Sequence, residues 1–73
     1  MRYVVELYTL TGNEGRSIDT AEFFADSDPK ARLAAEAWVV PLVGEMIGET
    51  TYLQMTAPEE SGRVVLSKRY GEF

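Results

Sequence analysis

Alternation of apolar and polar side chains marks four stretches of this chain, residues 2–10, 17–24, 50–57 and 63–70. Their content of Tyr, Val, Leu, Phe and Thr is typical of β-strands. Residues 29–38 lie between the second and third stretches and consist mostly of strong helix formers. The order is therefore strand, strand, helix, strand, strand. It predicts an α+β fold, with one kinked helix packed on one face of a small four-stranded antiparallel sheet.

The first stretch separates into two faces, because successive side chains of a strand point to opposite sides. Tyr3, Val5 and Leu7 form an apolar face, which we expect in the core. The opposite face is more polar and carries Arg2, Val4, Glu6 and Tyr8. Glycine-containing segments at 11–17 and 58–62 are typical of turns, so each pair of strands is predicted to form a hairpin.

Polar residues and a proline mark the start of the helix. Either Ser27 or Asp28 is suited to cap it, because both side chains can accept a hydrogen bond from the first helical N–H groups. Pro29 fits the first turn, where a missing N–H costs little.

A second proline, Pro41, lies where the helix would otherwise continue. A proline inside a helix removes one hydrogen bond and clashes with the preceding turn. We therefore expect a kink or break near 38–41, followed by a short turn that runs to Ile47 and ends at Gly48.

An advance of about 100° per residue assigns the faces of this helix. Arg32 and Glu36 mark the predicted solvent side, and Val39 and Val43 fall beside them. The predicted core side lies roughly opposite and carries Ala31, Ala34, Ala37 and Trp38. The two valines are therefore predicted to be partly exposed and to form a protein contact. The alternative is that Pro41 turns this segment inward and buries both of them.

The composition limits the chemistry that is available. The 73 residues suffice for a single domain, 1–73. There is no cysteine and no histidine, so disulfides, the usual zinc sites, cysteine nucleophiles and histidine-based triads are excluded. The paired acids at 26 and 28 and at 59 and 60 are explained by helix capping and by a solvated turn. We therefore expect no enzymatic activity and no cofactor.

The N-terminal stretch lacks the apolar run and cleavage site of a signal peptide. The longest apolar run is far shorter than the roughly 20 residues that span a bilayer. These features predict a cytoplasmic protein that does not bind a membrane.

Charge is the strongest indication of a partner. The chain has 12 acidic and 7 basic residues, a net charge of −5. Direct binding to nucleic acid is disfavoured, because it requires basic side chains to neutralise phosphates. A basic protein surface is favoured instead. Acidic residues that would attract such a partner over long range are Glu14, Asp19, Glu22, Asp26 and Asp28. In this interpretation Glu36, Val39 and Val43 form the short-range contact.

Two other functions stay open on the sequence. In the first, the apolar helix packs against its own copy in a homodimer, or the chain is an accessory subunit. In the second, aromatic and basic side chains bind a single-stranded nucleic acid weakly. The residues suited to that second role are Tyr8, Tyr52, Lys68 and Arg69. The basic last strand is also explained as a sheet edge protected from aggregation.

One part of the chain resembles a known layout. It consists of Ser27 through Pro29, followed by Ala31, Ala34 and Ala35 in a helix between two hairpins. It is similar to small phage-encoded inhibitors, the anti-CRISPR proteins of strand-strand-helix-strand-strand organisation. The resemblance covers much of the chain in outline but only about ten residues in sequence. It implies a non-enzymatic inhibitor that binds and blocks one target surface, often a basic nucleic-acid-binding groove.

Overall fold

The computed structural model describes residues 1–11, 14–44 and 50–70. The first hairpin is formed by β1 (Arg2–Thr11) and β2 (Glu14–Phe24), and the helix α1 spans Asp28–Gly44. The second hairpin is formed by β3 (Thr51–Ala57) and β4 (Arg63–Tyr70), which are joined by the short 3-10 helix η1 (Pro58–Glu60). The predicted order of the elements is confirmed.

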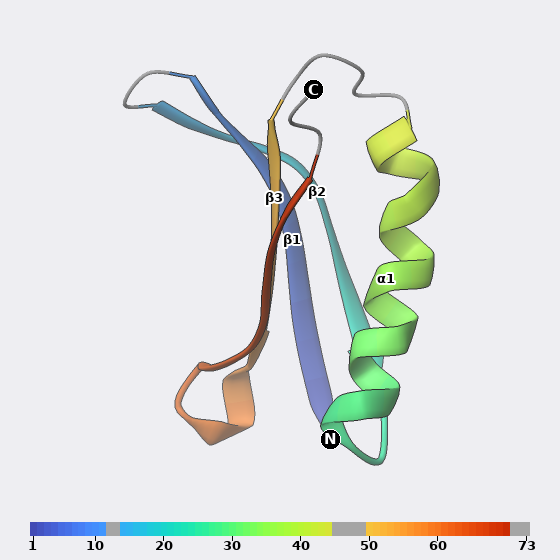
Figure 1. The fold of residues 1–73 in the computed structure, drawn as a ribbon. Coiled ribbons are helices and arrows are strands. Elements are labelled where there is room, and N and C mark those ends of the chain that lie inside the picture. Colours follow the sequence, from blue (N-terminus) through green and yellow to red (C-terminus); the bar gives the residue numbers. More distant parts are fainter. Residues whose placement is uncertain (12–13, 45–49, 71–73) are drawn as a thin grey trace.

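The four strands form one sheet in the order β2-β1-β3-β4, and every neighbouring pair is antiparallel. The helix α1 lies along one face of this sheet and leaves the other face open (Figure 1). Because α1 connects the two hairpins, it brings β3 beside β1, and β2 and β4 become the two edges. The predicted α+β architecture is therefore confirmed.

The core lies between α1 and the two central strands. Tyr3, Val5 and Leu7 of β1 are fully buried, as the alternation predicts. From β3, Leu53 and Met55 enter the same layer. The helix contributes its buried residues along one line four residues apart, namely Ala31, Ala35 and Val39. Two of these three are alanines, so the helix backbone can approach the sheet closely.

Each edge strand contains one irregularity in its pairing with the central strand. Leu7 pairs with Asp19 and Tyr8 pairs with Ser17, so Ile18 is an extra residue in β2. In β4 the extra residue is Val65, because the partners of Met55 and Thr56 are two residues apart. Such β-bulges increase the local twist of a strand. Ile18 and Val65 pack against the core from opposite edges of the sheet.

The hairpin between β3 and β4 is closed by two residues with left-handed backbone angles. Ser61 has φ 61° and Gly62 has φ 72°. The Gly62 N–H donates to the Ala57 carbonyl over 3.1 Å, which fixes the turn after η1. Serine tolerates this conformation less well than glycine, so Ser61 carries the local backbone strain.

Pro41 does not end the helix, so of the kink or break expected near 38–41 the break is wrong. α1 continues as one helix to Gly44. The ring of Pro41 is exposed, so the carbonyl of Ala37, which loses its usual donor, lies on the side that faces water. Water can then replace the missing bond. The predicted turn to Ile47 and the cap at Gly48 lie outside the described residues.

Candidate binding surfaces

From Leu33 onward, the surface of α1 that points away from the sheet is apolar. Leu33 is 70% exposed and Val40 is 67% exposed. Ala37 is exposed between them, and a Cβ placed on Gly44 would meet no atom within 4 Å. Pro41 borders this strip and is also exposed. We call Leu33, Ala37, Val40 and Gly44 the outward helix face. Glu36 is the one charged residue from Leu33 to Gly44, and it is half-buried at the flank of this strip.

The predicted apolar contact at Val39 and Val43 requires a correction. Val39 is 0% exposed and belongs to the core, and Val43 is half-buried against it. The error came from taking Arg32 and Glu36 as the centre of the solvent side. Both are half-buried at the flank of the helix. Long charged side chains can lay their aliphatic stems on apolar neighbours while the charged ends reach water.

The same rotation of the helix moves two other residues relative to the prediction. Ala37, predicted on the core side, is exposed. Trp38 is half-buried, and its ring meets Phe23 of β2 edge-on, with ring centres 6.3 Å apart and planes at 76°. The sequence analysis missed Leu33 and Val40. They lie four residues before and three residues after Ala37, on one uncharged strip of the helix, and this spacing could have identified them.

At its N-terminus α1 is fixed to the sheet by one carboxylate. The Tyr3 hydroxyl donates to Asp28 Oδ1 over 2.8 Å. Arg63 donates to both oxygens of Asp28, from Nη1 over 2.9 Å and from Nη2 over 3.2 Å. Arg63 Nε also donates to Glu60 Oε2 over 2.6 Å. We call these four residues the Asp28 network; they join α1, β1, η1 and β4.

These contacts move the pKa values of three groups. Hydrogen bonds from Arg63 and then from Tyr3 lower the pKa of Asp28 below its ordinary value of 3.8. Burial, followed by the hydrogen bond to Asp28, raises the pKa of the Tyr3 hydroxyl above 10.0. The hydrogen bonds to Asp28 and Glu60 raise the pKa of Arg63 further above its ordinary value. The carboxylate, the phenol and the guanidinium therefore keep their usual charge states near neutral pH.

The two capping candidates have different roles in the structure. The Lys30 N–H donates to Ser27 Oγ over 3.5 Å, and the Ala31 N–H donates to the Ser27 carbonyl over 3.0 Å. Ser27 is therefore the residue that caps α1, although its side-chain bond is long. Asp28 instead directs its carboxylate to Tyr3 and Arg63.

On the open face of the sheet, the most prominent feature is an aromatic pair. Tyr8 and Tyr52 are cross-strand neighbours, with ring centres 5.5 Å apart and planes at 20°. Arg69 pairs with Tyr52 in the β3–β4 register and so shares this face. Lys68 is on the opposite face, with Nζ 5.0 Å from the centre of the Tyr70 ring. The four residues predicted for nucleic-acid binding are therefore divided between two faces.

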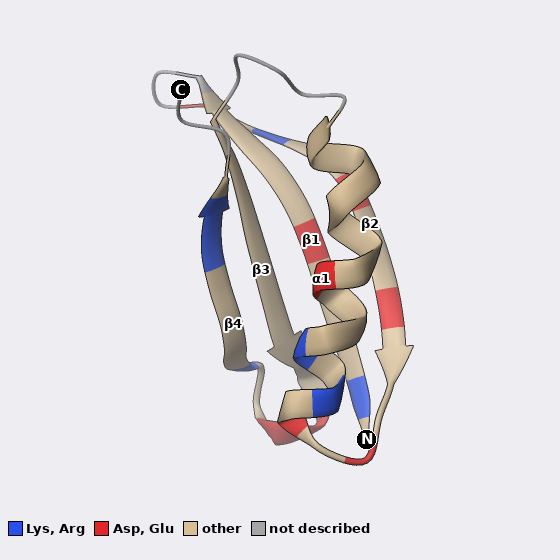
Figure 2. Cartoon of the chain, turned by 45° about the vertical axis from the view of Figure 1, so that its right-hand side comes forward, with Lys and Arg blue, Asp and Glu red and all other residues tan. Residues whose placement is uncertain are grey.

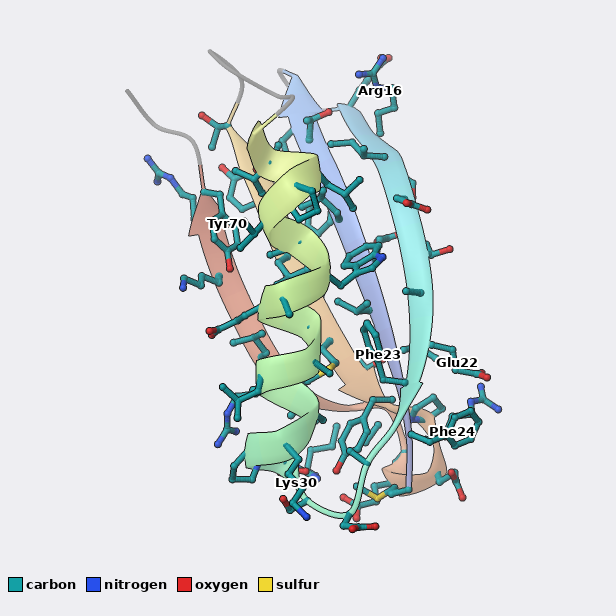
Figure 3. All side chains as sticks on the ribbon, turned by 90° about the vertical axis from the view of Figure 1, so that its right-hand side faces the viewer. Arg16, Glu22, Phe23, Phe24, Lys30 and Tyr70 are labelled. Atoms are coloured by element: carbon teal, nitrogen blue, oxygen red, sulfur yellow. The ribbon has the colours of Figure 1, made fainter. Side chains whose placement is uncertain are left out.

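Two exposed apolar side chains lie toward the margins of the open face. Phe24, at the end of β2, is 72% exposed, and Val64 of β4 is 53% exposed. Phe23 and Phe24 lie on opposite sides of β2, the first toward α1 and the second away from it (Figure 3). They lie on the two edge strands of the sheet, with β1 and β3 between them.

The predicted acidic group follows β2 and the segment that leads into α1. Three of its members are held by ion pairs: Glu22 with Arg2 at 3.0 Å, Asp26 with Lys30 at 3.5 Å, and Asp28 with Arg63 at 2.9 Å. The remaining two are Glu14 and Asp19, both exposed. Asp19 Oδ1 accepts a hydrogen bond from the adjacent Thr20 N–H over 2.8 Å. The charge available to a partner is thus smaller than the sequence indicates.

Residues 1–11, 14–44 and 50–70 enclose no pocket. Within the same ranges, no group of three or more acidic side chains is arranged to hold a metal ion. No helix in the described part of the chain has the length and apolar character needed to cross a bilayer.

Comparison with known proteins identifies no relative. No family model, no curated protein and no solved structure matches this chain.

Proposed function

We propose that this chain is a non-catalytic protein-binding module that inserts its outward helix face into an apolar groove of a partner protein. The observation that carries the proposal is the exposure of Leu33 and Val40 on a regular helix. The one charged residue from Leu33 to Gly44 is Glu36, which lies half-buried at the flank of the helix. An apolar strip at this spacing is how a helix is recognised by a groove. Contiguous exposed apolar surface on a small protein marks interaction sites.

The size of the strip favours a groove over a flat surface. From Leu33 to Gly44 the helix rises about 17 Å and, with its side chains, is about 10 Å across. A flat partner would therefore cover only about 170 Å² of it, against the roughly 800 Å² per partner of a stable interface. A groove also covers the half-buried flanks at Arg32, Ala34 and Glu36, so it reaches a larger area.

The charge of the chain favours a basic partner. Its net charge is −5, and Glu14 and Asp19 are exposed outside the ion pairs described above. Such charges accelerate the encounter with a basic surface, whereas the apolar contact slows dissociation. The finer proposal follows from this and from the resemblance to anti-CRISPR inhibitors. The partner would be a basic nucleic-acid-binding protein, and the chain would block its binding surface.

The experiment is a quantitative comparison of captured partners between the native chain and Leu33→Ser/Val40→Ser, using lysate of the native host. We expect the double variant to lose the partners that bind through α1. The free energy of unfolding of the double variant should stay within about 0.5 kcal/mol of the native value, because both side chains are exposed.

Val64→Ser is the matched control, since it removes an exposed valine from the open face of the sheet. It should keep every partner. Equal capture by the double variant and the native chain would contradict the proposal, as would loss of the same partners by Val64→Ser.

A second candidate function is supported by the Tyr8–Tyr52 pair beside Arg69, because stacked aromatics next to a basic residue suit single-stranded nucleic acids. Two observations count against nucleic-acid binding. Lys68 is on the other face of the sheet, and the next row of the open face carries Glu6 opposite Gln54.

A further inference from the structure

The two edges of the sheet carry opposite charge. The strand β2 contains three acidic residues, Glu14, Asp19 and Glu22, and one basic residue, Arg16. The strand β4 contains Arg63, Lys68 and Arg69 and no acidic residue. Figure 2 shows the acidic positions along β2 and the basic positions on β4, at opposite sides of the sheet. Each edge also has backbone N–H and C=O groups that point away from the sheet.

We propose that copies of this chain join head to tail, with the β4 edge of one copy pairing with the β2 edge of the next. The direction of the strands allows this. Neighbours in the order β2-β1-β3-β4 are all antiparallel, so β4 runs opposite to β2. A copy placed beside β4 in the same orientation therefore continues the antiparallel pairing, and its helix lies on the same face.

In the register that we propose for this contact, Lys68 of one copy lies opposite Asp19 of the next. Both residues belong to the helix-covered face, because they pair with Leu53 and Leu7 in their own copy. The same register sets Leu66 opposite Ala21. A slip of one residue would put Lys68 and its neighbour on different faces. A slip of two residues one way would set Lys68 opposite Ala21, which has no charge.

Asp19 and Lys68 are the charges that such a contact would neutralise. Both are exposed. Within the described residues, the carboxylate of Asp19 accepts a hydrogen bond from the adjacent Thr20 N–H, and Lys68 lies over the ring of Tyr70. By contrast, Glu22 and Arg63 on the same two edges are already held by ion pairs within one copy.

The opposite charges of the two edges favour pairing with a second copy over the interpretation of β4 as an edge protected from aggregation. Lysine on an edge strand ordinarily prevents sheets from pairing, because two basic edges repel each other. Here the other edge, β2, is acidic. The basic β4 edge of one copy therefore attracts the β2 edge of the next. A contact between different surfaces of identical chains produces rings or open filaments rather than a two-fold dimer.

The first test is the mass of the full chain in solution as a function of protein concentration and salt. We expect the mass to rise above 8.2 kDa with concentration at low salt. It should fall back toward that value in about 1 M salt, where the screening length is about 3 Å. A mass of 8.2 kDa at every concentration and salt would overturn the proposal.

Charge reversal makes the test specific. Lys68→Glu and Asp19→Lys should each remain monomeric alone, since each creates a like-charge contact. An equimolar mixture of the two variants should associate again, because every contact between unlike variants then joins opposite charges. Glu6→Lys is the matched control for Asp19→Lys. It makes the same charge change on a central strand and should still associate.

The outcomes also separate this inference from the proposed function. A mixture of the two variants that stays monomeric would overturn head-to-tail pairing. So would loss of self-association in Leu33→Ser/Val40→Ser, because the contact would then lie between helices. Head-to-tail pairing uses the sheet edges and leaves the outward helix face uncovered, so either proposal can fail while the other stands.

Discussion

Asp28 illustrates how a single side chain can determine where a helix rests on a sheet. Its carboxylate accepts hydrogen bonds from Tyr3, whose side chain is fully buried, and from both terminal nitrogens of Arg63. Hydrogen bonds that involve a charged group are roughly twice as strong as neutral ones. The bond from Tyr3 also satisfies a hydroxyl that the core would otherwise leave without an acceptor.

The lowered pKa of Asp28 predicts a specific response to acid. A carboxyl group whose pKa is lower in the folded state than in the unfolded state stabilises the fold above its unfolded pKa. That stability is lost as the pH falls from about 3.8 through the lower folded value. Between neutral pH and about pH 2, the melting temperature should therefore fall further for the native chain than for Asp28→Asn.

Asp26→Asn serves as the control for this measurement, because Asp26 forms an exposed pair with Lys30 at 3.5 Å. Exposed pairs of this kind contribute little, about 0.3–0.5 kcal/mol. The acid sensitivity of Asp26→Asn should match that of the native chain. The same fall in melting temperature for Asp28→Asn and the native chain would show that the network does not stabilise the charged carboxylate.

Single residues also show the limit of reading a helix from its sequence. The apolar character of residues 37–43 was evident, and so was the inference that part of it faces outward. The sequence did not show which of Val39 and Val40 faces outward, because successive side chains of a helix point about 100° apart. Only the flank positions of Arg32 and Glu36 settle that direction, and those depend on how the helix lies on the sheet.

For the helix as an element, the small residues on its buried line are the main determinant of its distance from the sheet. Ala31 and Ala35 are fully buried beneath it. Ala35→Leu should therefore destabilise the protein by about 1–3 kcal/mol, because extra methylene groups in a packed core force side chains and backbone to shift.

The outward helix face provides the control for that substitution. Ala37→Leu makes the same chemical change on the exposed side of the same helix, and its cost should stay within about 0.5 kcal/mol. Thermal or denaturant unfolding of both variants measures the difference. Equal destabilisation would mean that the helix is rotated from the orientation described above.

For the molecule as a whole, the order of the elements could be predicted because strand and helix patterns are local. The two hairpins followed from the same local signals. The sheet order β2-β1-β3-β4 could not be predicted, because the β1–β3 pairing joins segments that α1 separates in the chain. The bulges at Ile18 and Val65 were also missed, since neither has a turn residue to mark it.

The titration of the whole chain leads to a further prediction. The sequence contains no histidine, the side chain that ordinarily titrates between about pH 6 and 8. In the described residues, the pKa values of Asp28, Tyr3 and Arg63 move away from neutrality. The melting temperature should therefore form a plateau across that range. A transition centred near pH 7 would require a carboxyl group with a strongly raised pKa.

The proline in α1 has a consequence for what can cover the helix. Pro41 has no N–H, so the Ala37 carbonyl lacks the donor that an ordinary residue would supply. Ala37 lies at the centre of the outward helix face, where water can serve that carbonyl. A purely hydrocarbon groove would remove the water and leave a buried acceptor unsatisfied, at a cost of about 1–3 kcal/mol. A well-matched groove would place a hydroxyl or amide donor opposite the Ala37 carbonyl. This requirement distinguishes between partner grooves of equal hydrophobicity.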